Sequence, residues 1–131
     1  MTRGRHPELG RTIAEPVARR RGKVHMIDQG RDRALDLLIT TPGHVILVSI
    51  QRSERLGDSI LNIVADYREP IQRIREIPGG GPVCRELWLY SRYETLRFFR
   101  IENSALIELG ADGMLLPADM GNGENRISGQ D

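Results

Sequence analysis

The chain has 131 residues, 39% of them hydrophobic and 28% charged, a composition typical of one folded domain with its own core. No hydrophobic run approaches the ~20 residues that a membrane helix needs, and the arginine-rich beginning is followed by no hydrophobic stretch of the secretory type. The single Cys84 excludes an internal disulfide bond and fits a reducing compartment, so we expect a cytoplasmic protein with no membrane contact.

The formal net charge of +1 hides an uneven distribution of charge along the chain. Residues 1–23 carry seven basic and two acidic side chains, whereas residues 111–131 carry one basic and four acidic side chains. We expect one domain over residues 1–110 with a basic N-terminal arm, and a flexible acidic tail over residues 111–131. The arm is either solvated or a contact for nucleic-acid phosphates, and its candidate residues are Arg19, Arg20, Arg21 and Lys23.

The first expected elements are a short helix and a strand. Thr12 begins a capping-box pattern, and Gly22 is a typical helix end, so the helix is expected between them. Pro16 would then fall in the first turn, where its missing N–H costs little. The alternative is a helix that begins near Pro7 and kinks at Pro16. Residues 23–28 alternate polar and apolar side chains, which predicts a strand.

A hairpin is expected at residues 37–50, around which the rest of the chain is organised. Residues 37–39 and 45–50 are rich in β-branched and apolar side chains, as buried strands are. Between them, Pro42 and Gly43 suit the two central positions of a type II turn. A two-residue loop fixes the register, so that the numbers of facing residues add to 85.

This register predicts a polar cluster at the open end of the hairpin. Asp36 would face Ser49, with Gln51 one diagonal step away on the same face. A slip of one residue would send Asp36 and Ser49 to opposite faces. The cluster would therefore contain one carboxylate, one hydroxyl and one amide.

The second half of the chain predicts a helix and two further strands. Hydrophobic residues spaced by three and four over residues 56–77 predict one helix, which Pro70 kinks or divides, and the unbroken phase favours the kink. Residues 83–91 and 95–102 have one apolar and one mixed face, as strands near a sheet edge do. Residues 104–109 are expected to pack on the body as a short apolar segment.

The expected order α-β-β-β-α-β-β, with Asp36 at the end of the second strand and Ser49-Ile50-Gln51 on the third, resembles the PD-(D/E)XK superfamily of nucleases. The layout is nearest to the archaeal Holliday-junction resolvases. The resemblance covers about residues 8 to 102 and implies a restriction-endonuclease-like α/β fold with a mixed central sheet of about five strands. It implies that Asp36 is a catalytic Mg²⁺ ligand and that DNA is the partner.

The sequence departs from the family at the other two site positions. Ser49 stands where the family has an acidic metal ligand, and Gln51 stands where it has the lysine that positions or activates water. A hydroxyl is a weak ligand for Mg²⁺, and an amide supplies no positive charge. A carboxylate from another element would have to complete a metal site, and the candidates are Glu8, Glu15, Glu54, Asp58 and Glu69.

Three functions are therefore open. In the first, the chain would be a metal-dependent DNA endonuclease that uses Asp36, Ser49 and Gln51, with Mg²⁺ held by Asp36. Alternatively, it is an inactive nuclease-like domain that binds nucleic acid through its basic arm. The third reading is a protein-interaction or assembly domain on the same fold. The short exposed strands are compatible with a homodimer in each case.

Overall fold

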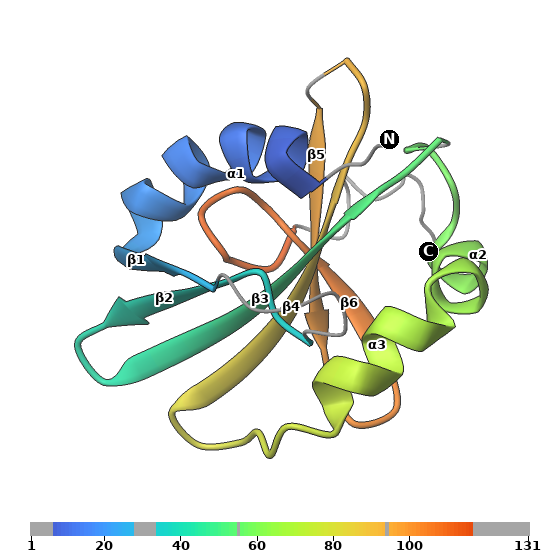
Figure 1. Ribbon diagram of the computed structural model, residues 1–131. Helices are drawn as coiled ribbons and strands as arrows, with labels where there is room; N and C mark the ends of the chain where they lie inside the picture. Colours follow the sequence, from blue (N-terminus) through green and yellow to red (C-terminus); the bar gives the residue numbers. More distant parts are fainter. Residues whose placement is uncertain (1–6, 28–33, 55, 94, 117–131) are drawn as a thin grey trace.

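The computed structural model describes residues 7–27, 34–54, 56–93 and 95–116, and in these ranges a six-stranded mixed sheet is flanked by three helices (Figure 1). The elements are α1 (Pro7–Arg21), β1 (Lys23–Met26), β2 (Leu37–Thr41), β3 (His44–Arg52), α2 (Ile60–Asp66), α3 (Arg68–Arg75), β4 (Val83–Tyr90), β5 (Leu96–Ile101) and β6 (Leu106–Leu109). The predicted α/β class is confirmed. The sheet has six strands rather than about five because β6, expected as a packed segment, pairs with β5. Within the described ranges, no helix is long and apolar enough to cross a membrane.

The strands lie in the sheet in chain order, and only β3 and β4 run parallel. The predicted hairpin is confirmed with its register: Thr41 pairs with His44, and Leu37 pairs with Val48. Gly43 has a φ of 89°, as the second central position of a type II turn requires. The ladder ends at Leu37, so Asp36 lies just outside it.

The first helix begins at Pro7, and Pro16 therefore lies inside it rather than in its first turn. The expected start at Thr12 is wrong, and the alternative start near Pro7 holds. A proline inside a helix removes one backbone hydrogen bond. Burial offsets this loss, because Ala14 and Ala18 are completely buried against the sheet.

Two glycines let α1 lie close to the sheet. A Cβ atom at Gly10 would lie 2.6 Å from Cε1 of Tyr90, and one at Gly22 would lie 2.6 Å from the carbonyl oxygen of Thr40. These two contacts also fix the direction of the helix, which starts near the end of β3 and finishes beside the β2–β3 turn.

The second helical region divides into two helices instead of kinking at Pro70. The break is at Tyr67, whose φ of −113° and ψ of 31° are not helical. Pro70 is the third residue of α3, where its missing N–H does no harm. A continuous helix would instead bring the ring of Pro70 against the carbonyl of Asp66 and leave that carbonyl unpaired.

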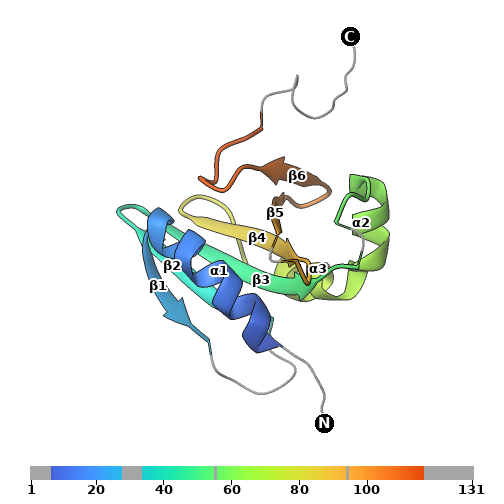
Figure 2. The ribbon, with the colours of Figure 1, turned by 90° about the horizontal axis from the view of Figure 1, so that it is seen from above.

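The strand β4 lies between β3 and β5, in the middle of the sheet. The prediction that residues 83–91 lie near a sheet edge is therefore wrong. The β4 residues Leu87, Trp88 and Leu89 are completely buried. One hydrophobic core lies between the sheet and α1, and the other lies between the sheet and the helices α2 and α3 (Figure 2). Each face of β4 carries one buried polar residue, Glu86 on the α1 side and Arg85 on the α3 side.

Arginine side chains tie loops to the sheet on the α3 side. Arg85 donates to the carbonyl oxygens of Arg75 and Ile77 at 3.1 and 3.3 Å, and to Oδ1 of Asn103 at 3.0 Å. Arg97 binds the Glu108 carboxylate through two hydrogen bonds of 2.9 and 2.7 Å. Arg97 also donates to the carbonyls of residues 56 and 58, which anchors the approach to α2.

The close approach of α1 can be tested at Gly22. We expect Gly22→Ala to lower the free energy of unfolding by about 1–3 kcal/mol, because the added methyl group would collide with backbone. Gly57→Ala is the matched control, since a Cβ at Gly57 meets nothing within 4 Å. Urea unfolding of both variants makes the comparison, and equal stability of the two would contradict the packing of α1.

Candidate functional site

Asp36 is buried immediately before β2 and is held against β3. Its Oδ2 accepts a hydrogen bond of 2.7 Å from the backbone N–H of Ile50. Its own N–H donates to the carbonyl of Val48 at 2.8 Å, and its carbonyl accepts from Ile27 at 3.0 Å. Only 7% of the residue is exposed. The carboxylate thus binds backbone on the strand that carries the two other predicted site residues.

Ser49 and Gln51 lie two positions apart on β3, and their side chains point to the same face of the sheet as Leu47. Nε2 of Gln51 donates to Oγ of Ser49 at 3.1 Å. Ser49 is buried and Gln51 is half-buried. The structure therefore joins Ser49 to Gln51, and it places Asp36 at the backbone of Ile50 between them.

The donors at this place fit Mg²⁺ poorly. Asp36 is the one carboxylate among the three predicted residues, and the other two donors are a hydroxyl and an amide. No three His, Cys, Asp or Glu side chains gather into a metal site within the described ranges. Of the carboxylates proposed to complete the site, Glu15 accepts from Arg19 at 2.9 Å, and Glu54 lies 3.6 Å from Nε of Arg52. The side chain of Glu8 lies outside the described part of the chain.

Beside Asp36, the carboxyl ends of the parallel strands β3 and β4 meet. The N–H of Ser53, just after β3, donates to the carbonyl of Tyr90 at 2.8 Å. The hydroxyl of Tyr67 donates to the carbonyl of Arg52 at 2.6 Å. A cavity of about 460 Å³ opens here, and it is lined by Ser53, Glu54, Leu56, Ser91, Arg92, Tyr93 and Thr95. Sequence reasoning missed this polar group because its members come from separate segments.

Two tyrosines at this end of the sheet have raised pKa values. Burial raises the pKa of Tyr67, and the neighbouring carboxylates of Asp66, Asp58 and Glu54 add to the rise, against a hydrogen bond with Ser53 that lowers it. Burial also raises the pKa of Tyr90, where the charge of Arg52 acts in the opposite direction and that of Asp36 in the same direction. Both phenols therefore stay protonated at neutral pH, and that of Tyr67 serves as a hydrogen-bond donor.

The basic residues that the sequence singled out lie at the opposite end of the sheet. Lys23, on β1, pairs with Thr40 of β2. Arg20 lines a cavity together with His44. His44 and Gln51 are separated along β3 by seven residues, or roughly 23 Å at 3.3 Å per residue. The structure does not bring Arg20 and Lys23 together with the predicted catalytic cluster.

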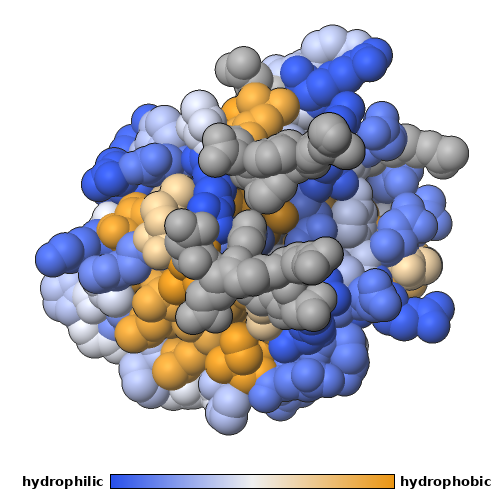
Figure 3. All heavy atoms as spheres, viewed as in Figure 1, coloured by the Kyte–Doolittle hydropathy of each residue, from blue (hydrophilic) through white to orange (hydrophobic). Residues whose placement is uncertain are grey.

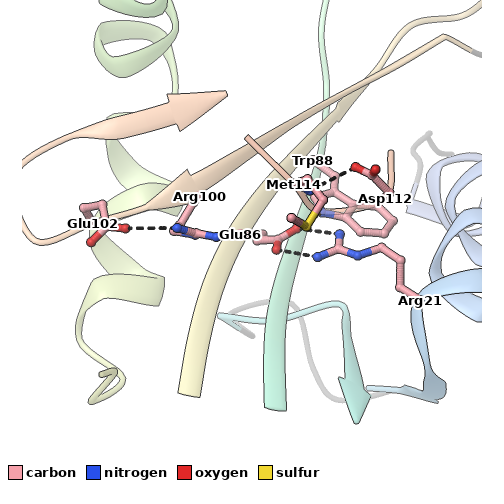
Figure 4. A network of polar contacts seen from close by, with 7 residues as sticks. All are labelled: Arg21, Glu86, Trp88, Arg100, Glu102, Asp112 and Met114. Carbon is pink, nitrogen blue, oxygen red and sulfur yellow. Dashed lines mark hydrogen bonds and ion pairs between the residues drawn. The ribbon is translucent and has the colours of Figure 1, made fainter. Parts of the chain in front are cut away.

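Arg21 differs from its neighbours Arg19 and Arg20, which are exposed. Its guanidinium donates to both carboxylate oxygens of Glu86, at 2.8 and 2.7 Å, and lies over the ring of Trp88 (Figure 4). The side chains of Arg21 and Glu86 are only 8% and 3% exposed. Nε1 of Trp88 donates to Oε1 of the same carboxylate at 2.8 Å. Arg21 is therefore part of the folded interior, and it is not available at the surface.

No protein-family description, curated protein or solved structure matches this chain in comparisons of sequence and structure.

The role of Asp36 can be tested by its effect on folding. We expect Asp36→Ala to lower the free energy of unfolding by about 1–3 kcal/mol, because the buried N–H of Ile50 loses its acceptor. Asp36→Asn keeps an acceptor oxygen and should cost less. Asp66→Ala, at an exposed carboxylate, is the control for urea unfolding. Equal stability of Asp36→Ala and the parent protein would contradict the structural role.

Proposed function

We propose that this chain is a nucleic-acid-binding domain with a nuclease-like fold, and that it binds without needing a metal ion. The path of the chain supports this proposal. Three antiparallel strands follow the first helix, and the α2–α3 region then leads to a strand parallel to β3. This order is the one on which the resemblance to the PD-(D/E)XK nucleases depends.

The observation that carries the proposal is the contact between Asp36 and Ile50. In the nuclease layout, an Asp at the end of the second strand works with two residues of the third strand. Here the 2.7 Å hydrogen bond places the carboxylate of Asp36 at the residue between Ser49 and Gln51. This contact supports the proposal, because Asp36, just before β2, meets the third strand between the two positions at which the family's second acidic ligand and lysine would be replaced by neutral side chains.

The surface offered to a phosphate backbone lies near the β2–β3 turn. Arg20 and Lys23 are exposed there, and His44 lies at the same end. Arg19 is also exposed, but its charge is paired with Glu15 on the next turn of α1. Cations that are exposed and lack a carboxylate partner are the groups that contact phosphates and release counterions.

A second candidate function is an assembly domain, and one observation favours it. The core on the α3 side is bordered by partly buried hydrophobic residues, among them Leu38, Val45 and Val83. On α2, Leu61 is 83% exposed. Figure 3 shows hydrophobic side chains gathered in the lower part of the view, bordered by hydrophilic residues. Apolar surface of this kind is typical of contacts between proteins.

Binding of DNA at increasing salt concentrations tests the proposal. We expect labelled single-stranded, duplex and branched DNA to bind with an affinity that falls steeply with salt. The double variant Arg20→Gln with Lys23→Gln should reduce the slope of log K against log salt by about 2, since each lost phosphate contact removes about 0.9 on duplex DNA. Arg68→Gln, at an exposed arginine on α3, is the matched control.

Two results would contradict the proposal. Stable self-association without measurable DNA affinity would favour the assembly domain. Cleavage of DNA in Mg²⁺ or Mn²⁺ that is lost in Asp36→Asn would show an active nuclease instead of a binding domain.

A further inference from the structure

A second and larger cavity, of about 690 Å³, lies between the end of α1, the β2–β3 turn and residues 111–114. Its charged lining consists of Arg20, Arg21, Glu86, Arg100 and Asp112, together with the imidazole of His44. The rest of the wall is largely apolar, and includes Ile46, Cys84 and Met114. The volume is in the range of sites for small molecules, about 300–1,000 Å³.

The floor of this cavity is fixed and carries no net charge. Arg21 and Glu86 satisfy each other through two hydrogen bonds, and Trp88 supplies a third to the carboxylate. Gly113 has a φ of 85° and lies against the guanidinium of Arg21, so closely that a side chain at this position would collide with it. The segment of residues 111–114 is thereby held over the ion pair.

Arg100 is a cation of this cavity for which no hydrogen bond to an acceptor is seen among the described residues. It lies opposite Glu86 in the β4–β5 ladder, but its guanidinium turns towards Glu102 (Figure 4). Nη1 lies 3.9 Å from the Glu102 carboxylate, which is beyond hydrogen-bond distance. Nε of Arg100 is buried and has no acceptor among the residues that the structure describes. A buried N–H without an acceptor costs free energy, and an anion beside it would lower that cost.

The charges that remain in the cavity favour an anion. Apart from the ion pair, the lining has two cations, Arg20 and Arg100, and one carboxylate, Asp112, which accepts a hydrogen bond of 2.9 Å from the N–H of Met114. Glu102, the partner of Arg100 at 3.9 Å, is not part of the lining. Guanidinium groups bind phosphate oxygens through paired, charge-assisted hydrogen bonds. The apolar wall leaves room for the body of a ligand beside its charged group.

We propose that this cavity binds a terminal phosphate group, with Arg100 and Arg20 as its ligands and His44 at the rim. The phosphate belongs either to a free small molecule or to the end of an oligonucleotide. The site depends on the cavity and its charges, and it stands independently of the nucleic-acid-binding function proposed above.

Cys84 provides a reporter of occupancy, because it is the single cysteine of the chain, is partly exposed and lines the cavity. Its rate of alkylation by neutral iodoacetamide would be measured in inorganic phosphate, in a nucleoside 5′-monophosphate, and in oligonucleotides with a 5′-phosphate or a 5′-hydroxyl. Sodium chloride at matched ionic strength is the reference. We expect saturable slowing of alkylation by phosphate-terminated ligands.

Arg100→Gln should raise the ligand concentration needed for half-protection by about tenfold or more, as the loss of one charge-assisted contact implies. Arg20→Gln should also raise it, whereas Arg68→Gln, outside the cavity, should leave it unchanged. Thermal unfolding of each variant checks that the fold is retained.

The ligands separate the two sources of the phosphate. Protection by inorganic phosphate and the nucleotide alone supports a small-molecule site, and protection that requires the 5′-phosphate of an oligonucleotide supports a site for a strand end. Protection by both oligonucleotides to an equal, measurable extent, protection unchanged in Arg100→Gln, or no protection by any ligand would overturn the proposal. DNA binding measured on the same Arg100→Gln protein shows separately whether the nucleic-acid-binding function stands.

Discussion

The buried ion pair between Arg21 and Glu86 joins the end of α1 to the central strand β4. Both side chains are almost fully removed from water, and Trp88 completes the hydrogen bonding of the carboxylate. A charge left alone in such a place destabilises a protein by about 3–5 kcal/mol, so each partner depends on the other. The pair positions α1 on the sheet and forms the floor of the larger cavity. Because of this pair, Arg21 is buried, whereas Arg19 and Arg20 are exposed.

Local chemistry predicted the centre of the fold and missed its boundaries. Pro42 and Gly43 define the turn between β2 and β3, and the register of the two strands follows from counting residues. The start of α1 and the division of the second helix could not be predicted in the same way. The start of α1 depends on the burial of Ala14 and Ala18 against strands distant in sequence. The division between α2 and α3 depends on where a break near Pro70 costs the least free energy.

The candidate site shows the same limit. Arg19, Arg20 and Arg21 are alike in sequence, and only the partner 65 residues away distinguishes Arg21. Asp36 was predicted to face Ser49, but it leaves the ladder and binds the backbone of Ile50. The tyrosines, serines and Arg52 beside it meet because β3 and β4 are parallel, which a sequence pattern does not specify. The result is a sheet with the hydrogen-bonded residues Asp36, Ser49 and Gln51 near one end and exposed cations at the other.

A double-mutant cycle on Arg21 and Glu86, followed by urea unfolding, tests this account most directly. The account predicts that Arg21→Gln and Glu86→Gln each lower the free energy of unfolding by about 3–5 kcal/mol. The double variant should lose less than the sum of the two single losses, by about 1 kcal/mol or more. Two single losses that add within about 0.5 kcal/mol would contradict this coupling. The same holds for an Arg21→Gln protein that is as stable as the parent but binds DNA more weakly. Arg21 would then be a surface contact for nucleic acid rather than part of the folded interior.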